Sequence, residues 1–248
     1  MEKLLDAVGL VKRYAKFTLQ GVSLSVEAGK IVGFIGRNGA GKSTTLRAIA
    51  GLVHRDGGSV RICGMNIDEN AAACKTVMGT VFGGLEFYPH KKLKDIAEVT
   101  RRFYPQWDTE TYRKLTSRFS LDENKKFREL SNGMKVKFLL SLACSHRARL
   151  YVFDEPTSGL DPVSREEILS LMRALVRNGE CGVLFSTQIT SDLEKCADDI
   201  VFIRQGNIVH TAEKGEFIRS YAHLRQGRLP TLEEIMIAEE GVDEEFSF

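Results

Sequence analysis

The chain carries one stretch whose residue types and spacing suit the binding of phosphate. Residues 36–43 read Gly-Arg-Asn-Gly-Ala-Gly-Lys-Ser, a pattern in which backbone N–H groups surround phosphate oxygens at the start of a helix. We expect Lys42 to neutralise the β- and γ-phosphates of a nucleotide and the Ser43 hydroxyl to coordinate Mg²⁺. A glycine-rich turn matched by chance is the alternative, which is disfavoured because an apolar run precedes the motif and helix-forming residues follow it.

A pair of carboxylates at the end of a second apolar run could act on the same phosphates. Residues 150–155 read Leu-Tyr-Val-Phe-Asp-Glu. Asp154 would hold Mg²⁺ through its water shell, and Glu155 would polarise the attacking water as a general base. Taken alone, the motif describes a plain strand end equally well, so its weight comes from the phosphate-binding motif earlier in the chain.

These residues need a scaffold, and the hydrophobic pattern predicts an α/β core. Residues 31–35 are a continuous apolar run, typical of a strand buried on both faces, and residues 43–50 are helix formers. Residues 150–153 and 182–185 are two more short apolar runs, separated by the helix-patterned residues 163–177. The order strand, helix, strand predicts a parallel crossover unit.

Other segments surround this core. The N-terminal segment alternates apolar and polar residues, which predicts antiparallel strands; residues 58–63 have strand character, and residues 200–211 indicate a hairpin. Residues 91–144 are charged and helix-patterned, with Asp108 and Ser131 as candidate N-caps. We therefore expect an α/β fold: a P-loop nucleotide-binding core with a mainly parallel sheet, an N-terminal antiparallel β subdomain and an inserted α-helical subdomain.

Composition excludes several classes of protein. The chain has 248 residues, 43% of them hydrophobic, which suits a folded globular protein rather than a disordered one. No window approaches the roughly 18 apolar residues of a membrane span, and the N-terminal segment lacks the apolar core of a signal peptide. Five cysteines without a Cys-x-x-Cys pair argue against a disulfide framework or a zinc site. The formal net charge of +2 gives no general case for nucleic-acid binding.

Five further features, taken in chain order with the phosphate-binding motif, resemble the ATP-binding subunit of an ABC transporter. Tyr14 matches the aromatic residue that stacks on adenine in that family. Residues 130–134, Leu-Ser-Asn-Gly-Met, match the signature Leu-Ser-Gly-Gly-Gln at Leu, Ser and the second Gly. Asp154-Glu155 is the carboxylate pair, residues 158–161 match the loop through which two subunits meet, and residues 185–188 occupy the place of the switch histidine. The resemblance covers residues 3–215.

The resemblance implies an ATPase with ATP and Mg²⁺ as cofactors. Two subunits, as a homodimer or a heterodimer, would close head to tail on two ATP molecules, with Ser131 and Gly133 of one subunit facing the γ-phosphate held by the other. Hydrolysis would open the dimer and drive a separate membrane permease, so the subunit would be cytoplasmic and peripheral on the inner face of the cell membrane. Without the family, Ser131 is an ordinary helix cap and Tyr14 a half-buried strand residue.

The substituted signature and residues 230–236, Pro-Thr-Leu-Glu-Glu-Ile-Met, are similar to the ATPases of bacterial exporters of the drug-resistance and ABC-2 type. A soluble ABC ATPase that acts on ribosomes or DNA is the alternative function, but such proteins usually carry two cassettes or a long coiled-coil insert. A P-loop kinase is a third reading, against which the signature and the subunit-contact loop argue.

The chain departs from the family pattern at two active-site positions. Gln188 replaces the switch histidine, and glutamine keeps a donor and an acceptor but cannot titrate. Gly83 stands where the family has a glutamine that touches the metal site, with Glu86 as the nearest polar substitute. We expect ATP binding to survive and hydrolysis to be slow, although Gln188 could also position the γ-phosphate adequately.

Charge is unevenly distributed along the chain. Residues 91–149 hold 15 basic and 7 acidic residues, a local charge of +8, whereas residues 232–248 hold seven acidic residues and no Lys or Arg. A solvated helical surface is the default interpretation of the basic segment; the functional one is contact with an acidic permease segment or with anionic lipid. Four aromatic residues lie near this segment: Phe82, Phe87, Tyr88 and Phe103. They could line an apolar docking groove, or they could belong to the core of the helical segment, which is the favoured interpretation for Phe103.

These inferences give a division of the chain and a set of site residues. Residues 1–220 form the expected ABC ATPase domain, with the helical subdomain at about 85–145, and residues 221–248 an acidic C-terminal tail that regulates or solvates. The expected catalytic residues are Lys42, Glu155 and Gln188, and the expected metal ligands are Ser43 and Asp154. The expected nucleotide-binding residues are Tyr14, Gly36, Arg37, Asn38, Gly39, Ala40, Gly41, Lys42, Ser43, Thr44, Ser131 and Gly133.

Overall fold

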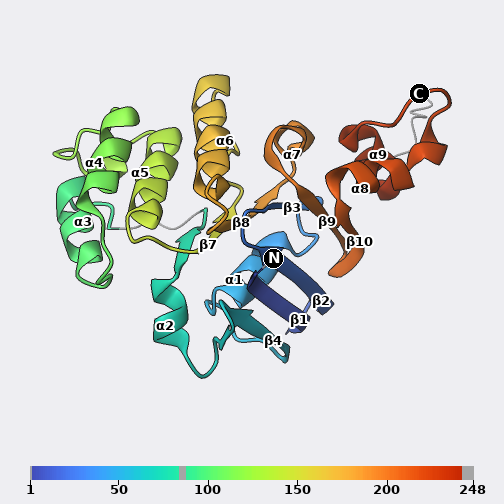
Figure 1. The fold of residues 1–248 in the computed structure, drawn as a ribbon, viewed down its shortest axis with the longest axis horizontal. Coiled ribbons are helices and arrows are strands. Elements are labelled where there is room, and N and C mark those ends of the chain that lie inside the picture. Colours follow the sequence, from blue (N-terminus) through green and yellow to red (C-terminus); the bar gives the residue numbers. More distant parts are fainter. Residues whose placement is uncertain (1, 84–87, 242–248) are drawn as a thin grey trace.

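Two β-sheets form the centre of the computed structural model, which describes residues 2–83 and 88–241 (Figure 1). The smaller sheet is antiparallel with strand order β2-β1-β4-β5, and the larger has the order β10-β9-β3-β8-β7-β6. The smaller sheet consists of β1 (Lys3–Tyr14), β2 (Phe17–Glu27), β4 (Gly57–Ile62) and β5 (Met65–Asn66). The larger sheet consists of β3 (Ile31–Ile35), β6 (Met78–Val81), β7 (Leu150–Asp154), β8 (Gly182–Thr187), β9 (Asp199–Arg204) and β10 (Asn207–Glu213).

The larger sheet is parallel except for its last strand. β6 pairs with β7, β7 with β8, β8 with β3 and β3 with β9, all in parallel, and β10 closes the edge as the second strand of a hairpin with β9. β7 and β8 are joined through α6 (Pro162–Val176), which confirms the predicted crossover unit. Both β3 and β7 are buried along their whole length, as their continuous apolar sequences predict.

Helices cover both faces of the larger sheet. α1 (Lys42–Ile49) and the antiparallel sheet lie on one face of the larger sheet. The core between these elements contains Leu5, Phe34, Leu46 and Val152. α6 and α7 (Thr190–Cys196) lie on the other face (Figure 1) and pack on Phe153, Phe185 and Phe202. The predicted α/β fold with an N-terminal antiparallel part is therefore confirmed. The remaining short helices are α2 (Ala71–Thr76) and α8 (Lys214–Ser220).

Residues 88–144 are mainly helical and have a core of their own. The helices are α3 (Leu93–Arg101), α4 (Thr109–Arg118) and α5 (Asn132–Cys144), which enclose Ile96, Phe127 and Phe138. Both predicted caps are confirmed: Asp108 accepts hydrogen bonds from the backbone of Glu110 and Thr111, and Ser131 accepts one from Met134 N–H. Within the described residues no helix is both long and apolar enough to cross a membrane.

The prediction that Phe103 belongs to the helical core is wrong. α3 ends at Arg101, so Phe103 lies in a turn outside the helical periodicity, and its exposed fraction is 72%. The next residue, Tyr104, packs inward instead and stacks on His146 with ring centroids 4.0 Å apart. Of the other three aromatic candidates, Phe82 is buried, Tyr88 is exposed, and Phe87 lies outside the described residues.

Part of the segment that the sequence sets apart as an acidic tail is a packed helix. α9 (Leu232–Glu240) begins with a capping box between Thr231 and Glu234. Its residues Leu232 and Ile235 are buried in the same core as α6 and α7. The segment was assigned as a tail from its seven acidic residues alone. Leu232 and Ile235 are three positions apart, a spacing that places them on one face of a helix.

Candidate functional site

The turn between β3 and α1 has the geometry of a phosphate-binding loop. A Cβ atom on Gly36 would lie 2.3 Å from the carbonyl oxygen of Ile203, so only glycine fits there. Gly41 has φ +114°, a conformation that side chains disfavour. Within the part of the chain that the structure describes, no side chain caps α1. The first N–H groups of α1 and the positive end of its dipole are therefore available to an anion.

Lys42 holds a buried positive charge inside this loop. Its side chain is only 4% exposed, and its ammonium group donates to the carbonyl oxygens of Gly36 at 2.8 Å and Arg37 at 3.2 Å. The same nitrogen lies 3.4 Å from Oε1 of Glu155. The structure therefore brings together the cation of the loop and one of the two predicted carboxylates, which come from distant parts of the sequence.

Asp154 is buried at the end of β7 and accepts two hydroxyl hydrogen bonds. Ser43 Oγ donates to Asp154 Oδ1 at 3.0 Å, and Ser186 Oγ donates to the same oxygen at 2.7 Å. Sequence reasoning missed the role of Ser186. The signal was present in the strand pairing, because Ser186 lies directly opposite Asp154 in the β7–β8 ladder. Parallel neighbours of that kind meet at the carboxyl edge of the sheet.

Glu155 is held in a strained conformation next to Asp154. Its φ is +48°, which costs a residue with a side chain on the order of 1–3 kcal/mol. Its N–H donates to Ser186 at both Oγ, 3.0 Å, and the carbonyl oxygen, 3.2 Å. Ser186 therefore anchors both carboxylate residues, and its two hydrogen bonds to the N–H of Glu155 hold the strained backbone of that residue in place.

The oxygen atoms of Ser43 and Asp154 fit Mg²⁺. Magnesium prefers oxygen ligands and is usually held by one or two protein groups together with phosphate and water. The described residues contain no cluster of three or more His, Cys, Asp or Glu side chains that could hold a metal by themselves. A divalent cation at Ser43 and Asp154 would accordingly need phosphate oxygens to complete its coordination.

Two clefts adjoin these residues. One, of about 380 Å³, lies on the phosphate loop and is lined by Lys16, Phe17, Lys42 and Thr44, among others. The second, of about 740 Å³, contains Ser43, Asp154 and Glu155 and reaches Asn132 and Lys135 at the start of α5. The active-site groups therefore line an open cleft bounded by the phosphate loop on one side and by α5 on the other.

Tyr14 is the strand partner of a residue that lines the smaller cleft. It ends β1 and pairs with Phe17 of β2, and Phe17 both lines that cleft and packs beneath Gly41. The ring of Tyr14 is 48% exposed, with the ammonium group of Lys12 5.5 Å from its centroid. The ring of Tyr14 is therefore accessible, and its role in stacking on a base stays a prediction.

The remaining predicted residues surround the site without contacting its centre. Ser131 is exposed at the N-terminus of α5, and among the described residues no hydrogen bond joins it to the phosphate loop. Gln188 is exposed just after β8. Gly83 lines the larger cleft, and a Cβ atom there would meet no atom of the described residues within 4 Å. Glu86, the suggested polar substitute, lies outside the described residues.

Comparison with known proteins gives one consistent result. Residues 19–158 match the family model described as ABC transporter. The chain is 31% identical to the ABC transporter ATP-binding protein YtrB of Bacillus subtilis over 84% of this chain and 70% of that protein. It is 33% identical to the Nod factor export ATP-binding protein I of Burkholderia orbicola (82% and 68%), and 28% identical to the bacitracin transport ATP-binding protein BcrA of Enterococcus faecalis (87% and 71%). A solved ATP-binding subunit of an ABC transporter superposes with a TM-score of 0.84 at 26% identity, covering 95% of this chain and 98% of that one.

Proposed function

The chain belongs to the ABC transporter family of ATP-binding ATPases, and from this premise we propose that it is the motor subunit of an exporter that drives a separate membrane permease. The observation that carries the proposal is the meeting of phosphate-loop residues with the carboxylates at the end of β7 in two pairs, Lys42 with Glu155 at 3.4 Å and Ser43 with Asp154 at 3.0 Å. Export is favoured because two of the relatives are named for the export of Nod factor and the transport of bacitracin.

Each residue at the centre has a proposed role in hydrolysis. Mg²⁺, held by Ser43 and Asp154, would neutralise charge on the phosphate oxygens. Lys42 binds the β- and γ-phosphates, and the nearby N–H groups of α1 orient them. Glu155 accepts a proton from the attacking water. Tyr14 stacks on the base.

A second subunit would complete the site. Ser131 and Gly133 lie at the exposed N-terminus of α5, where a helix end favours an anion. In the proposed head-to-tail dimer these residues bind the γ-phosphate of ATP held by the partner, and residues 158–161 contact the partner's active site. The partner is a second copy or a related ATPase subunit.

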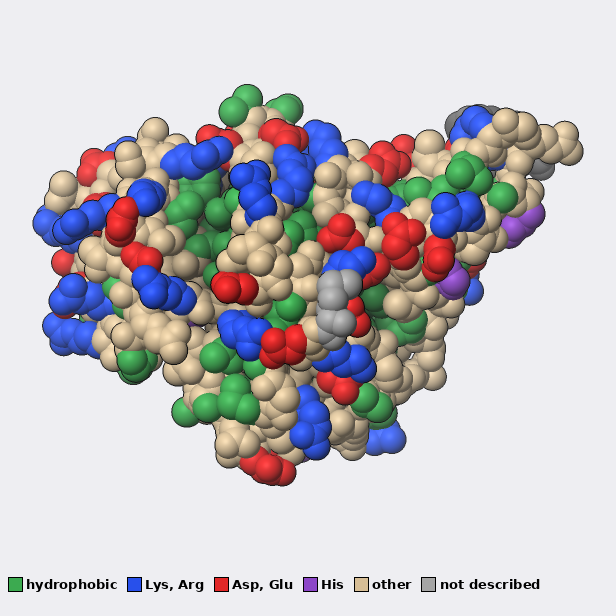
Figure 2. All heavy atoms as spheres, in the orientation of Figure 1, with side chains coloured by type: hydrophobic (Ala, Val, Ile, Leu, Met, Phe, Trp, Pro, Cys, Tyr) green, Lys and Arg blue, Asp and Glu red, His purple; other side chains and the backbone are tan. Residues whose placement is uncertain are grey.

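The helical segment offers a surface for the permease. A pocket of about 220 Å³ lies between Phe82, Leu139 and His146, and Leu52 at its rim is 54% exposed. Figure 2 shows Lys and Arg side chains along the edge formed by α3 and α4, with fewer acidic ones between them. A short acidic, partly apolar segment of a permease fits this combination, which would place the protein at the inner face of the membrane.

Residues 1–220 are the proposed ATPase domain, with residues 85–145 as its helical subdomain and 221–248 as an acidic C-terminal segment.

Substitution of Gln188 and Gly83 tests the proposed slow hydrolysis. Gln188→His restores a titratable group, and Gly83→Gln restores the family's glutamine at a position where an added Cβ would meet no atom of the described residues within 4 Å. We expect either change, and most of all the double variant, to raise the steady-state ATPase rate. An unchanged rate in the double variant would show that Gln188 already positions the γ-phosphate adequately.

The motor function itself is tested by co-purification of the chain from detergent-solubilised membranes, followed by ATP-dependent transport in vesicles. Recovery with a membrane protein supports export. Recovery on ribosomes or DNA, without a membrane protein, supports the alternative of a soluble ABC ATPase.

A further inference from the structure

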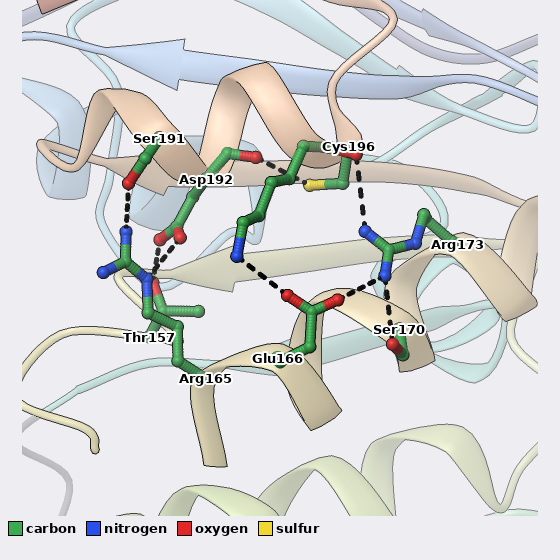
Figure 3. Close-up of polar contacts among 9 residues, drawn as sticks. Thr157, Arg165, Glu166, Ser170, Arg173, Ser191, Asp192 and Cys196 are labelled. Atoms are coloured by element: carbon green, nitrogen blue, oxygen red, sulfur yellow. Dashed lines mark hydrogen bonds and ion pairs between the residues drawn. The ribbon is translucent and has the colours of Figure 1, made fainter. Parts of the chain in front are cut away.

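A hydrogen-bonded network outside the phosphate site joins α6 to α7 (Figure 3). At its centre lies Asp192, whose exposed fraction is 0%. Its Oδ2 accepts a hydrogen bond from Thr157 Oγ1 at 2.6 Å, and its Oδ1 accepts one from Nε of Arg165. Arg165 also donates to Ser191 Oγ at 2.7 Å, so both oxygens of the buried carboxylate have a partner and the guanidinium is fixed on α7.

The network connects two loops that border the active site. Thr157 follows Glu155 by two residues and directly precedes the proposed subunit-contact loop, residues 158–161. Asp192 is on the first turn of α7, four residues after Gln188. The Asp161 side chain caps α6, the helix that carries Arg165. One carboxylate therefore ties the loop after β7 to the first turn of α7, and through that turn to the short loop after β8 that carries Gln188.

Physical chemistry makes this tie rigid. Hydrogen bonds to an ionised group are stronger than neutral ones, and removing one partner leaves a buried charge undersatisfied. The two loops consequently cannot separate without breaking charge-assisted contacts in a buried site.

We propose that Asp192 is a positioning residue that makes the subunit-contact loop and the segment carrying Gln188 move as one unit with Glu155. This inference rests on the proposed roles of Glu155 and Gln188 in hydrolysis. Contact with a second subunit at residues 158–161 would then be transmitted to the position of Gln188 through Thr157 and Asp192. ATP binding alone does not need the network, because none of its residues touches the phosphate loop among the described contacts.

A second clamp between the same helices provides a matched control. Glu166 of α6 bonds to Arg173 at 2.7 Å and to Lys195 of α7 at 2.9 Å (Figure 3). This clamp joins α6 to α7 but contacts neither loop.

The test compares three variants of the full chain: Thr157→Val, which removes only the hydroxyl donor, Thr157→Ser, which keeps it, and Glu166→Gln. We expect Thr157→Val to lower kcat for ATP about tenfold while KM changes less than twofold, because misplaced catalytic groups slow the chemistry without weakening binding. Thr157→Ser and Glu166→Gln should retain the parental kcat. Hydrogen–deuterium exchange of the parental chain and the variants supplies a readout that needs no turnover.

Exchange in residues 156–162 and 186–192 should increase together in Thr157→Val and in neither control. Parental kcat together with unchanged exchange in Thr157→Val overturns the inference, as does an equal loss of kcat in Glu166→Gln. A parental chain that binds ATP but does not hydrolyse it refutes the proposed function instead, and the exchange data then still decide whether Asp192 couples the two loops.

Discussion

Replacement of Ser186 by alanine is expected to weaken Mg²⁺ binding and ATP hydrolysis as well as the fold. Ser186 is fully buried, and its hydroxyl donates to Asp154 at 2.7 Å while it accepts from the N–H of Glu155 at 3.0 Å. The substitution removes both contacts without adding bulk. Asp154 keeps the Ser43 hydroxyl, and the N–H of Glu155 keeps the carbonyl oxygen of residue 186.

The magnitude follows from these remaining partners. A hydrogen bond to an ionised group contributes roughly 1.5–3 kcal/mol. The bond to the N–H of Glu155 is largely replaced by its existing second acceptor. We therefore expect the free energy of unfolding to fall by about 2 kcal/mol. Loss of a residue that orients a metal ligand typically weakens metal affinity about 10–100-fold, so the Mg²⁺ concentration for half-maximal ATPase activity should rise at least about tenfold.

The assay is a Mg²⁺ titration of ATPase activity at saturating ATP, paired with denaturant unfolding. Ser141→Ala is the matched control, because Ser141 is equally buried but donates only to the Lys137 carbonyl within α5. We expect the control to keep the parental Mg²⁺ requirement. An unchanged requirement in Ser186→Ala would refute the conclusion that Ser186 orients Asp154.

Three further predictions address stability. Ile235→Ala should lower the free energy of unfolding by about 2–5 kcal/mol, because it truncates a side chain that is 1% exposed, whereas a solvated tail predicts no change in denaturant unfolding. Hydrogen bonds from Arg173 and Lys195 lower the pKa of Glu166 to about 2. The contacts of ionised Glu166 with Arg173 and Lys195 therefore stabilise the fold above the ordinary pKa near 4.5, and this stabilisation is lost as pH falls toward 2. The difference in melting temperature between the parental chain and Glu166→Gln should shrink between these two pH values. Burial lowers the pKa of His146, so the folded state disfavours protonation of this residue and the free energy of unfolding should fall as pH drops below about 6.5. In His146→Phe the free energy of unfolding should depend less on pH in that range. An identical pH dependence in the variant and the parental chain would contradict the role given to His146.

Local sequence patterns predicted the elements that position the chemistry. The continuous apolar runs became β3, β7 and β8, and the caps at Asp108 and Ser131 are present, because such signals act over a few residues. The meeting of Ser43 with Asp154 is a tertiary contact, inferred from motif chemistry rather than from periodicity.

Features that depend on tertiary packing could not be predicted in this way. Ser186 and Asp192 act through contacts with residues far away in the sequence, and the pairing of Ser186 with Asp154 and the burial of Asp192 become visible only in the folded chain. Phe103 was wrongly assigned to the helical core because the end of α3 two residues earlier takes it out of the helical pattern. α9 was overlooked because its acidic residues were counted without considering the helical spacing of Leu232 and Ile235. Both errors arise where local composition and tertiary packing favour different outcomes.

The strand order also bears on how the protein is made. The strand that leads into the phosphate loop, β3, lies between β8 and β9, with Ile31 opposite Val183 and Val32 opposite Asp199. During synthesis this apolar strand emerges early, yet its partners leave the ribosome only after most of the chain has been translated. We expect nascent chains to expose β3 until late, to need protection from aggregation during that interval, and to acquire nucleotide binding only near the end of translation.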